Sequence, residues 1–170
     1  MAVQKKISEL TAKSTELQPL DLLEVSEWNG ATYDTKSIEG SGFILHKKVS
    51  LTAAQIKTAN SVPITLITAP GAGFAIEVVS ALYNFQYGTV AFDSGGSQFE
   101  LRTDTASQME MLSAAVLNGT TSLFSKFDST YVAATQIVDN KALTFNLTGA
   151  DATVGDSTID LYINYRIITL

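Results

Sequence analysis

Two glycines with G-x-G spacing, Gly71 and Gly73, are the residues whose arrangement comes nearest to a phosphate-binding loop. They lie in the stretch TLITAPGAGFAIEVVSALYNFQYG, residues 65–88. A dinucleotide fingerprint needs a third glycine three residues later, followed by a helix whose N-terminus holds the pyrophosphate. Residue 76 is Ile instead, strand-forming residues follow it, and no Gly-Lys-Ser/Thr sequence is present for a Walker loop. We therefore expect a turn between two strands, in which both glycines adopt positive φ.

Other groups that could do nucleophilic or metal chemistry are scarce. His46 is the only histidine and there is no cysteine, so a Ser-His-Asp arrangement would depend on His46 alone and thiolate sites are excluded. We expect His46 to be solvated or to lie at an interface. Asp151 and Asp156 flank a glycine-containing loop and could share a calcium ion, but the run lacks the dense carboxylates of a dedicated site. A plain turn is the preferred interpretation.

The sequence also gives little indication of a pair of carboxylates that could catalyse hydrolysis. A sandwich-fold hydrolase would need convergent carboxylates with raised pKa values, and the spacing of Asp93, Glu100 and Asp104 does not demand them. The sequence thus predicts a protein that is not an enzyme, with no catalytic residue, no cofactor and no metal site.

Composition and charge narrow the class of partner. Apolar residues make up 45% of the 170 residues and charged residues only 16%, while 20 Thr and 16 Ser supply much of the polar surface. A weakly charged surface of this kind is easily buried against partners, so we expect an oligomer, a trimer by preference. Net charge of −6 disfavours nucleic acid as a partner. No apolar run is long enough to span a bilayer and the first ten residues lack a signal core, so we expect a soluble chain that is not exported by the Sec route and has no membrane partner.

The elements that position these residues divide near residue 45. We expect residues 1–45 to form an extended N-terminal docking arm, because its apolar groups are too few for a core. Within the arm, Asn29-Gly30 favours a tight type I′ hairpin, whose flanking residues Trp28 and Tyr33 form a cross-strand pair or, less favoured, a platform for stacking a sugar. The residues expected to become buried on docking are the larger apolar ones: Ile7, Leu10, Leu17, Leu22, Leu23 and Trp28.

Residues 46–170 predict a mainly β domain, a β-sandwich with jelly-roll character. Thr52 and Gln55 have the spacing of a capping box and predict one short helix in LTAAQIKTAN. Two adjacent strands are expected in VPITLITA and FAIEVVSALYNFQY, with further strands near 88–93, 98–103, 130–138 and 142–148. A last strand is expected in STIDLYINYRIITL, residues 157–170, with one core face that alternates with a polar face. The core face comprises Ile159, Leu161, Ile163, Tyr165 and Ile167, and the other face comprises Asp160, Tyr162, Asn164 and Arg166. Segment 107–119 predicts a short helix capped by Ser107, with a broken strand as the alternative.

Both ends of the chain resemble phage structural proteins. KISELTAKSTELQPLDLLEVSEWNGATYDTKSI is similar to the N-terminal anchoring segment of virion appendage proteins, through its K-I-S-x-L opening, its D-L-L-x-V run and a hairpin leading to a lysine-bearing strand. The T-x-x-Q, V-P-I-T-L, A-P-G-A-G and final Y-R-I-I motifs resemble a β-sandwich domain of head-fibre or capsid decoration proteins. The resemblance implies a structural virion protein that docks on other virion proteins through its arm. A receptor- or carbohydrate-binding module of a phage fibre is the alternative.

Overall fold

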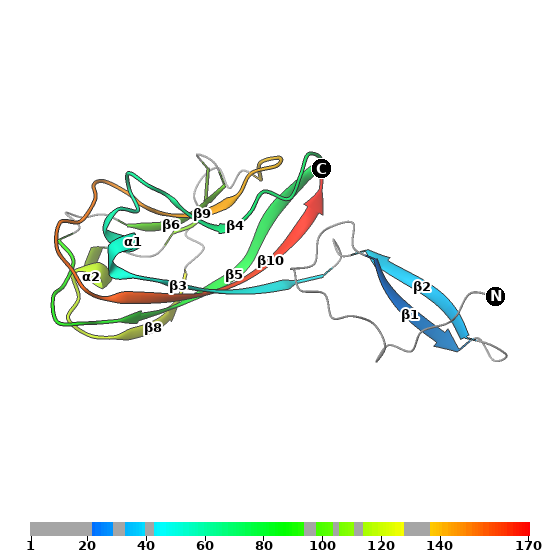
Figure 1. Cartoon of the computed structure of the whole chain (residues 1–170), viewed down its shortest axis with the longest axis horizontal. Helices are drawn as coiled ribbons and strands as arrows, with labels where there is room; N and C mark the ends of the chain where they lie inside the picture. Colours follow the sequence, from blue (N-terminus) through cyan, green and yellow to red (C-terminus); the bar gives the residue numbers. More distant parts are fainter. Residues whose placement is uncertain are drawn as a thin grey trace.

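The computed structural model describes residues 22–28, 33–39, 43–93, 98–103, 106–110, 114–127 and 137–170. These residues form a mainly β protein (Figure 1). Its elements are β1 (Leu22–Trp28), β2 (Tyr33–Glu39), β3 (Leu45–Leu51), α1 (Ala53–Lys57), β4 (Ile64–Ile67), β5 (Phe74–Gln86), β6 (Phe99–Thr103), β7 (Ala106–Glu110), α2 (Ala114–Leu117), β8 (Leu123–Lys126), β9 (Leu143–Leu147) and β10 (Thr158–Thr169).

Two antiparallel sheets pack as a sandwich, which confirms the predicted fold class at this level. One sheet has the strand order β3-β10-β5-β8. The other has the order β4-β9-β6, and β7 adds to its edge beside β6. From β3 onward the chain changes sheet at almost every connection, so neighbours in sequence are seldom neighbours in a sheet.

The core lies between the sheets and follows the two-residue period of the strands. In β10 the predicted apolar face is confirmed, because its inward residues are at most 5% exposed: Ile159, Leu161, Ile163, Tyr165 and Ile167. From the opposite sheet, Phe99 and Phe145 meet with ring centroids 4.8 Å apart. Burying a side chain of this size contributes roughly 2 to 3 kcal/mol, so this alternation is the main source of stability.

The glycine turn connects two sheets instead of two paired strands. Gly71 and Gly73 have φ of +108° and +81°, as expected for a turn between strands. The expectation that those strands are adjacent is wrong, because β4 pairs with β9 whereas β5 pairs with β10 and β8. Asn140 and Asp139 accept hydrogen bonds from the amides of Gly71 and Gly73 at 3.0 and 2.8 Å, which holds the crossing in place. The turn therefore binds a neighbouring loop of its own chain.

The predicted capping box is present. Thr52 accepts a hydrogen bond from the Gln55 amide, and the Gln55 side chain accepts one from the Thr52 amide at 2.9 Å. Ile56, on the inner side of this five-residue helix, is fully buried. Local sequence chemistry was sufficient to predict α1.

Three segments differ from the expected elements. Residues 88–93 are not a strand, since Asp156 accepts the amide hydrogens of Thr89 and Val90 and no sheet partner is used. Segment 107–119 is not one helix: β7 pairs with β6, placing Ser107 opposite Arg102, and among the described residues of the segment only α2 is helical. The short strand β8 was not expected. The strands predicted at 98–103 and 142–148 are present as β6 and β9, while most of 130–138 lies outside the described residues.

The hairpin expected in the N-terminal segment is present, with a different connection. β1 and β2 pair antiparallel from Leu22 opposite Glu39 to Trp28 opposite Tyr33, so Trp28 and Tyr33 are a cross-strand pair of positions. A two-residue turn at Asn29-Gly30 would instead pair Trp28 with Ala31. The predicted type I′ turn is therefore wrong, and the connection spans residues 29–32, which lie outside the described residues. The division into a docking arm, 1–45, and a sandwich, 46–170, stays a prediction; β3 begins at Leu45.

Gly155 is predicted to be far less replaceable than Gly71. Both have positive φ, but a Cβ at Gly155 would lie 2.1 Å from the buried Phe92 ring, whereas nothing lies within 4 Å at Gly71. Gly155→Ala should lower the free energy of unfolding in urea by about 2 to 4 kcal/mol, through backbone strain plus overpacking. Gly71→Ala, the matched control, should cost only about 1 to 2 kcal/mol of strain. Equal losses in the two variants would show that the Phe92 contact is not limiting.

Candidate functional site

The outer face of the β3-β10-β5-β8 sheet carries the most organised set of exposed side chains in the described residues. Cross-strand register builds it in rows. One row runs Lys48, Tyr162, Leu82, Lys126, and the next runs Ser50, Asp160, Asn84, Phe124. We call this surface the outer face; it consists of His46, Lys48, Ser50, Glu77, Ser80, Leu82, Asn84, Gln86, Phe124, Lys126, Asp160, Tyr162, Asn164 and Arg166.

A band of cationic and aromatic groups crosses this face. The Lys48 ammonium lies 5.3 Å from the centroid of the Tyr162 ring. Tyr162 and Phe124 meet edge to face with centroids 6.2 Å apart, although their strands are separated by β5. Phe124 remains 61% exposed. Such contacts contribute about 0.5 to 1 kcal/mol each at exposed sites, so the band attaches the short edge strand β8 to the centre of the sheet.

The charged groups of the outer face are paired within it. Asp160 accepts hydrogen bonds from the Ser50 hydroxyl at 2.5 Å and the Lys48 ammonium at 3.0 Å, and both lower the pKa of its carboxyl. The Arg166 guanidinium donates to Glu77, which raises the pKa of Arg166. Each of these two carboxylates therefore lies against a cation of the same face.

His46 belongs to the same face, which fits the expectation of a solvated or interface histidine. Its Nδ1 lies 2.6 Å from Oδ1 of Asn164, and Nδ2 of Asn164 donates to the Ser80 hydroxyl at 2.9 Å. The chain of contacts runs from β3 through β10 to β5, and it contains no carboxylate that would orient the imidazole as a general base. These contacts link β3, β10 and β5 to one another.

Three aspartates connect the loops at one end of the sandwich. Asp151 accepts from the amides of Asn60 and Ser61, each at 3.0 Å, and Asp93 accepts from the amides of Thr153 and Val154 at 2.7 and 3.1 Å. Asp156 accepts from the Thr89 and Val90 amides at 2.8 and 2.9 Å.

The main cause of the pKa changes at these aspartates is hydrogen bonding to the ionised form. The pKa of each carboxyl lies below its usual value, first through a hydroxyl: Ser61 for Asp151, Thr153 for Asp93 and Thr89 for Asp156. Asp151 binds backbone amides of the loop between α1 and β4, whereas Asp156 binds those of the loop between β5 and β6. Among the described residues, no three His, Cys, Asp or Glu side chains are grouped to hold a metal ion.

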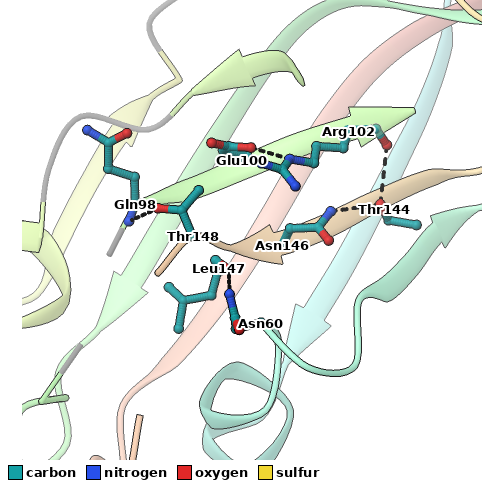
Figure 2. A network of polar contacts seen from close by, with 8 residues as sticks. All are labelled: Asn60, Gln98, Glu100, Arg102, Thr144, Asn146, Leu147 and Thr148. Carbon is teal, nitrogen blue, oxygen red and sulfur yellow. Dashed lines mark hydrogen bonds and ion pairs between the residues drawn. The ribbon is translucent and has the colours of Figure 1, made fainter. Parts of the chain in front are cut away.

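A polar network lies on the outward side of β6 and β9 (Figure 2). Glu100 is 5% exposed and pairs with Arg102, two residues along the same strand. On β9, the Asn146 amide donates to the Thr144 hydroxyl at 2.8 Å. No buried side-chain nitrogen or oxygen in the described part of the chain lacks a hydrogen-bond partner. Glu100 thus belongs to an ion pair and Asp93 to the loop contacts above, whereas Asp104 lies outside the described residues.

A hollow of about 340 Å³ opens between α2 and β8. Its lining is small and uncharged: Ala115, Val116, Gly119, Thr120, Thr121, Ser122 and Leu123. Ser122 already accepts a hydrogen bond from the Tyr87 amide at 3.0 Å. All its lining residues come from one short segment, so the hollow does not bring together groups from separate elements.

The residues expected at the docking interface are only partly described. Leu22, Leu23 and Trp28 lie on β1, opposite Glu39, Ile38 and Tyr33. Ile7, Leu10 and Leu17 lie outside the described residues. Sequence reasoning placed Tyr162 and Asn164 on the polar side of β10, but it missed Phe124 on β8, the partner of Tyr162, because the four-residue run Leu-Phe-Ser-Lys gave too short a strand signal. In the described residues no helix is long and apolar enough to cross a membrane.

The aspartate contacts predict that the protein loses stability in acid. A carboxyl whose folded pKa is depressed stabilises the fold above its unfolded pKa of about 3.9, and this stabilisation is lost as the pH falls through the folded value. We expect the thermal unfolding midpoint to fall between about pH 5 and pH 3. Asp156→Asn should lower the midpoint at neutral pH and flatten the acid limb, as calorimetry would show. An acid limb as steep as that of the native protein would contradict this role of Asp156.

Comparisons with known proteins give no assignment. No protein-family model, no curated protein and no solved structure matches the chain.

Proposed function

We propose that this protein is a non-enzymatic structural component of a bacteriophage virion: a head-fibre, decoration or other appendage protein that docks through an N-terminal arm and displays an oligomeric β domain. The observation that carries the proposal is the strand order of the sandwich. Virion proteins and lectins are prominent among proteins built on the eight-stranded jelly roll. A fold shared by many functions gives a class only, so the composition and the motifs must supply the rest.

The strand order supports jelly-roll character. Counted from β3, the first strand pairs with the eighth and the second with the seventh, as β3 with β10 and β4 with β9. The third pairs with the sixth and the fourth with the fifth, as β5 with β8 and β6 with β7. This nested pairing is what a long antiparallel ribbon gives when it wraps into two sheets through Greek-key connections.

Composition and motifs favour a virion over other jelly-roll proteins. Only 16% of the residues are charged, which suits repeated burial between subunits, and a homotrimer is the oligomer we propose. The motifs that resemble head-fibre and decoration proteins lie at α1, on β4, in the turn between β4 and β5, and on β10. The partners are then other capsid or appendage proteins, not nucleic acid or a membrane, and the protein is located in the virion.

The described carboxylates and the one histidine support a role without catalysis. His46 contacts Asn164, and the loop aspartates bind backbone amides of their own chain. These groups hold the fold in their present contacts, so a cofactor or metal is not part of the proposal.

The arm is the proposed docking element. The hairpin of β1 and β2 is a two-stranded sheet, and such a pair is marginally stable in water unless it packs on something else. Its edges could pair with a strand of another virion protein, with Leu22, Leu23 and Trp28 as anchors beside Ile7, Leu10 and Leu17.

A receptor- or carbohydrate-binding module of a fibre is the second candidate. Phe124, 61% exposed, is the observation that favours it, since an exposed ring can stack on a sugar. Binding on a glycan array that is lost in Phe124→Ala would support this candidate over the first.

Removing the arm tests the proposal. A chain that starts at residue 43 should stay folded and oligomeric but no longer attach to particles of the phage that encodes it, because attachment depends on anchors in the arm. Co-sedimentation of labelled protein with particles measures attachment, and circular dichroism and light scattering measure folding and mass.

Point variants in the full chain provide the control. Leu23→Ala and Trp28→Ala should each weaken attachment by roughly 1 to 3 kcal/mol if these residues anchor the arm. Val62→Ala, on an exposed loop of the sandwich, should leave attachment unchanged. Undiminished co-sedimentation of the truncated chain would show that docking does not use the arm, and aggregation of that chain would place the arm in the core instead.

A further inference from the structure

We infer that the outer face of the β3-β10-β5-β8 sheet is the surface that packs against a second copy of this chain. The inference rests on the oligomer of the proposed function and names the surface that forms it. Neither the strand order nor the arm would identify this surface.

The β5-β8 side of the outer face is apolar and accessible. Phe124 and Leu82 are 61% and 38% exposed and lie in neighbouring rows on the adjacent strands β8 and β5. The half-buried Tyr162 ring lies beside them and meets the Phe124 ring. Exposed apolar and aromatic side chains bordered by polar groups are typical of protein interfaces.

A protein partner can cover the polar groups of the rest of the outer face at a low cost in free energy. Asp160 is held by Ser50 and Lys48, Glu77 by Arg166, and Asn164 by His46 and Ser80. Burying an unpaired polar group costs about 1 to 3 kcal/mol, whereas a group that keeps its partner avoids most of that penalty. A saccharide site needs the opposite property, namely polar side chains whose hydrogen bonds are still available to the sugar. The mutual pairing therefore favours a protein partner.

The difference in net charge between the outer face and the rest of the chain favours another copy, packed head to tail, as that partner. Lys48, Lys126 and Arg166 against Glu77 and Asp160 give the outer face a net charge of +1, so the rest of a chain of net charge −6 carries −7. Two outer faces placed together would bring like charges into contact, whereas an outer face placed on the remaining surface of a neighbour brings opposite charges together. Heterologous contacts form a closed ring when the rotation between neighbouring copies closes, and a trimer is the smallest such ring. The proposed homotrimer requires this closed case.

Lys126 marks the direction of this contact. Within the described residues it has no acidic partner, in contrast to Lys48 and Arg166. In a head-to-tail interface its ammonium would be covered by the acidic surface of the neighbouring copy. A change of its charge therefore affects association without breaking a contact inside the subunit.

Two substitutions in the full-length chain test the inference by light scattering at micromolar concentration. Phe124→Glu and Lys126→Glu should each weaken association at least about tenfold, while circular dichroism stays native. Val62→Glu is the matched control, since Val62 is also 61% exposed but lies on the loop between α1 and β4. It should leave the mass unchanged. If Phe124→Glu disturbs β8, the mass of the Lys126→Glu variant still tests the inference.

The absence of cysteine allows a direct footprint. A thiol introduced by Lys126→Cys should react with a maleimide at least about tenfold more slowly in the oligomer than one introduced by Val62→Cys, and at the same rate in denaturant. Equal rates in the native oligomer, or native mass in both glutamate variants, would place the interface elsewhere and overturn the inference while the oligomer stands. A monomeric native chain would overturn the proposed oligomer and this inference together. Glycan binding lost in Phe124→Glu, with the mass unchanged, would assign the face to a sugar instead.

Discussion

The placement of β10 in the middle of its sheet is the constraint on which the rest of the structure depends. This strand of twelve residues pairs with β3 on one side and β5 on the other. Its inward residues supply the core, and its outward residues Asp160, Tyr162 and Asn164 bind partners on β3, β5 and β8. Because side chains alternate, a shift of one residue would send the charged set into the core, so burial fixes the register and with it the outer face.

The loops are fixed by a different interaction, the acceptance of backbone amide hydrogens by carboxylates. Residues 88–93 have the apolar composition of a strand, and Phe92 is buried, yet Asp156 binds the amides of Thr89 and Val90 that a ladder would otherwise use. A carboxylate that accepts several amides is strongly committed to its charged form. Asp151 and Asp156, which the sequence offered as possible calcium ligands, thus join the loop between β9 and β10 to the loops before β4 and after β5.

Local patterns predicted the elements whose causes are local. The capping box of Thr52 and Gln55 and the alternation of 158–169 were read correctly, because a helix cap and a half-buried strand need only neighbours in sequence. The sequence of β7 favoured a helix because of the helix propensity of Ala and Met. In the structure, pairing with β6 outweighs that propensity. The rows of the outer face join residues up to 118 positions apart, as His46 and Asn164 do, and no local pattern records such register.

The edges of the same sheet limit how copies of this chain can associate. β3 and β8 are its edge strands, and strand edges are where proteins most easily join into continuing sheets. β3 carries Lys47 and Lys48, while β8 has only four residues and ends at Lys126. Short edges and lysines both oppose pairing of strands between copies. A contact made through the outer face, in place of a strand edge, is therefore the route that this sheet leaves open. Because that face is assembled from β3, β5, β8 and β10, it exists only after the C-terminal strand has entered the sandwich.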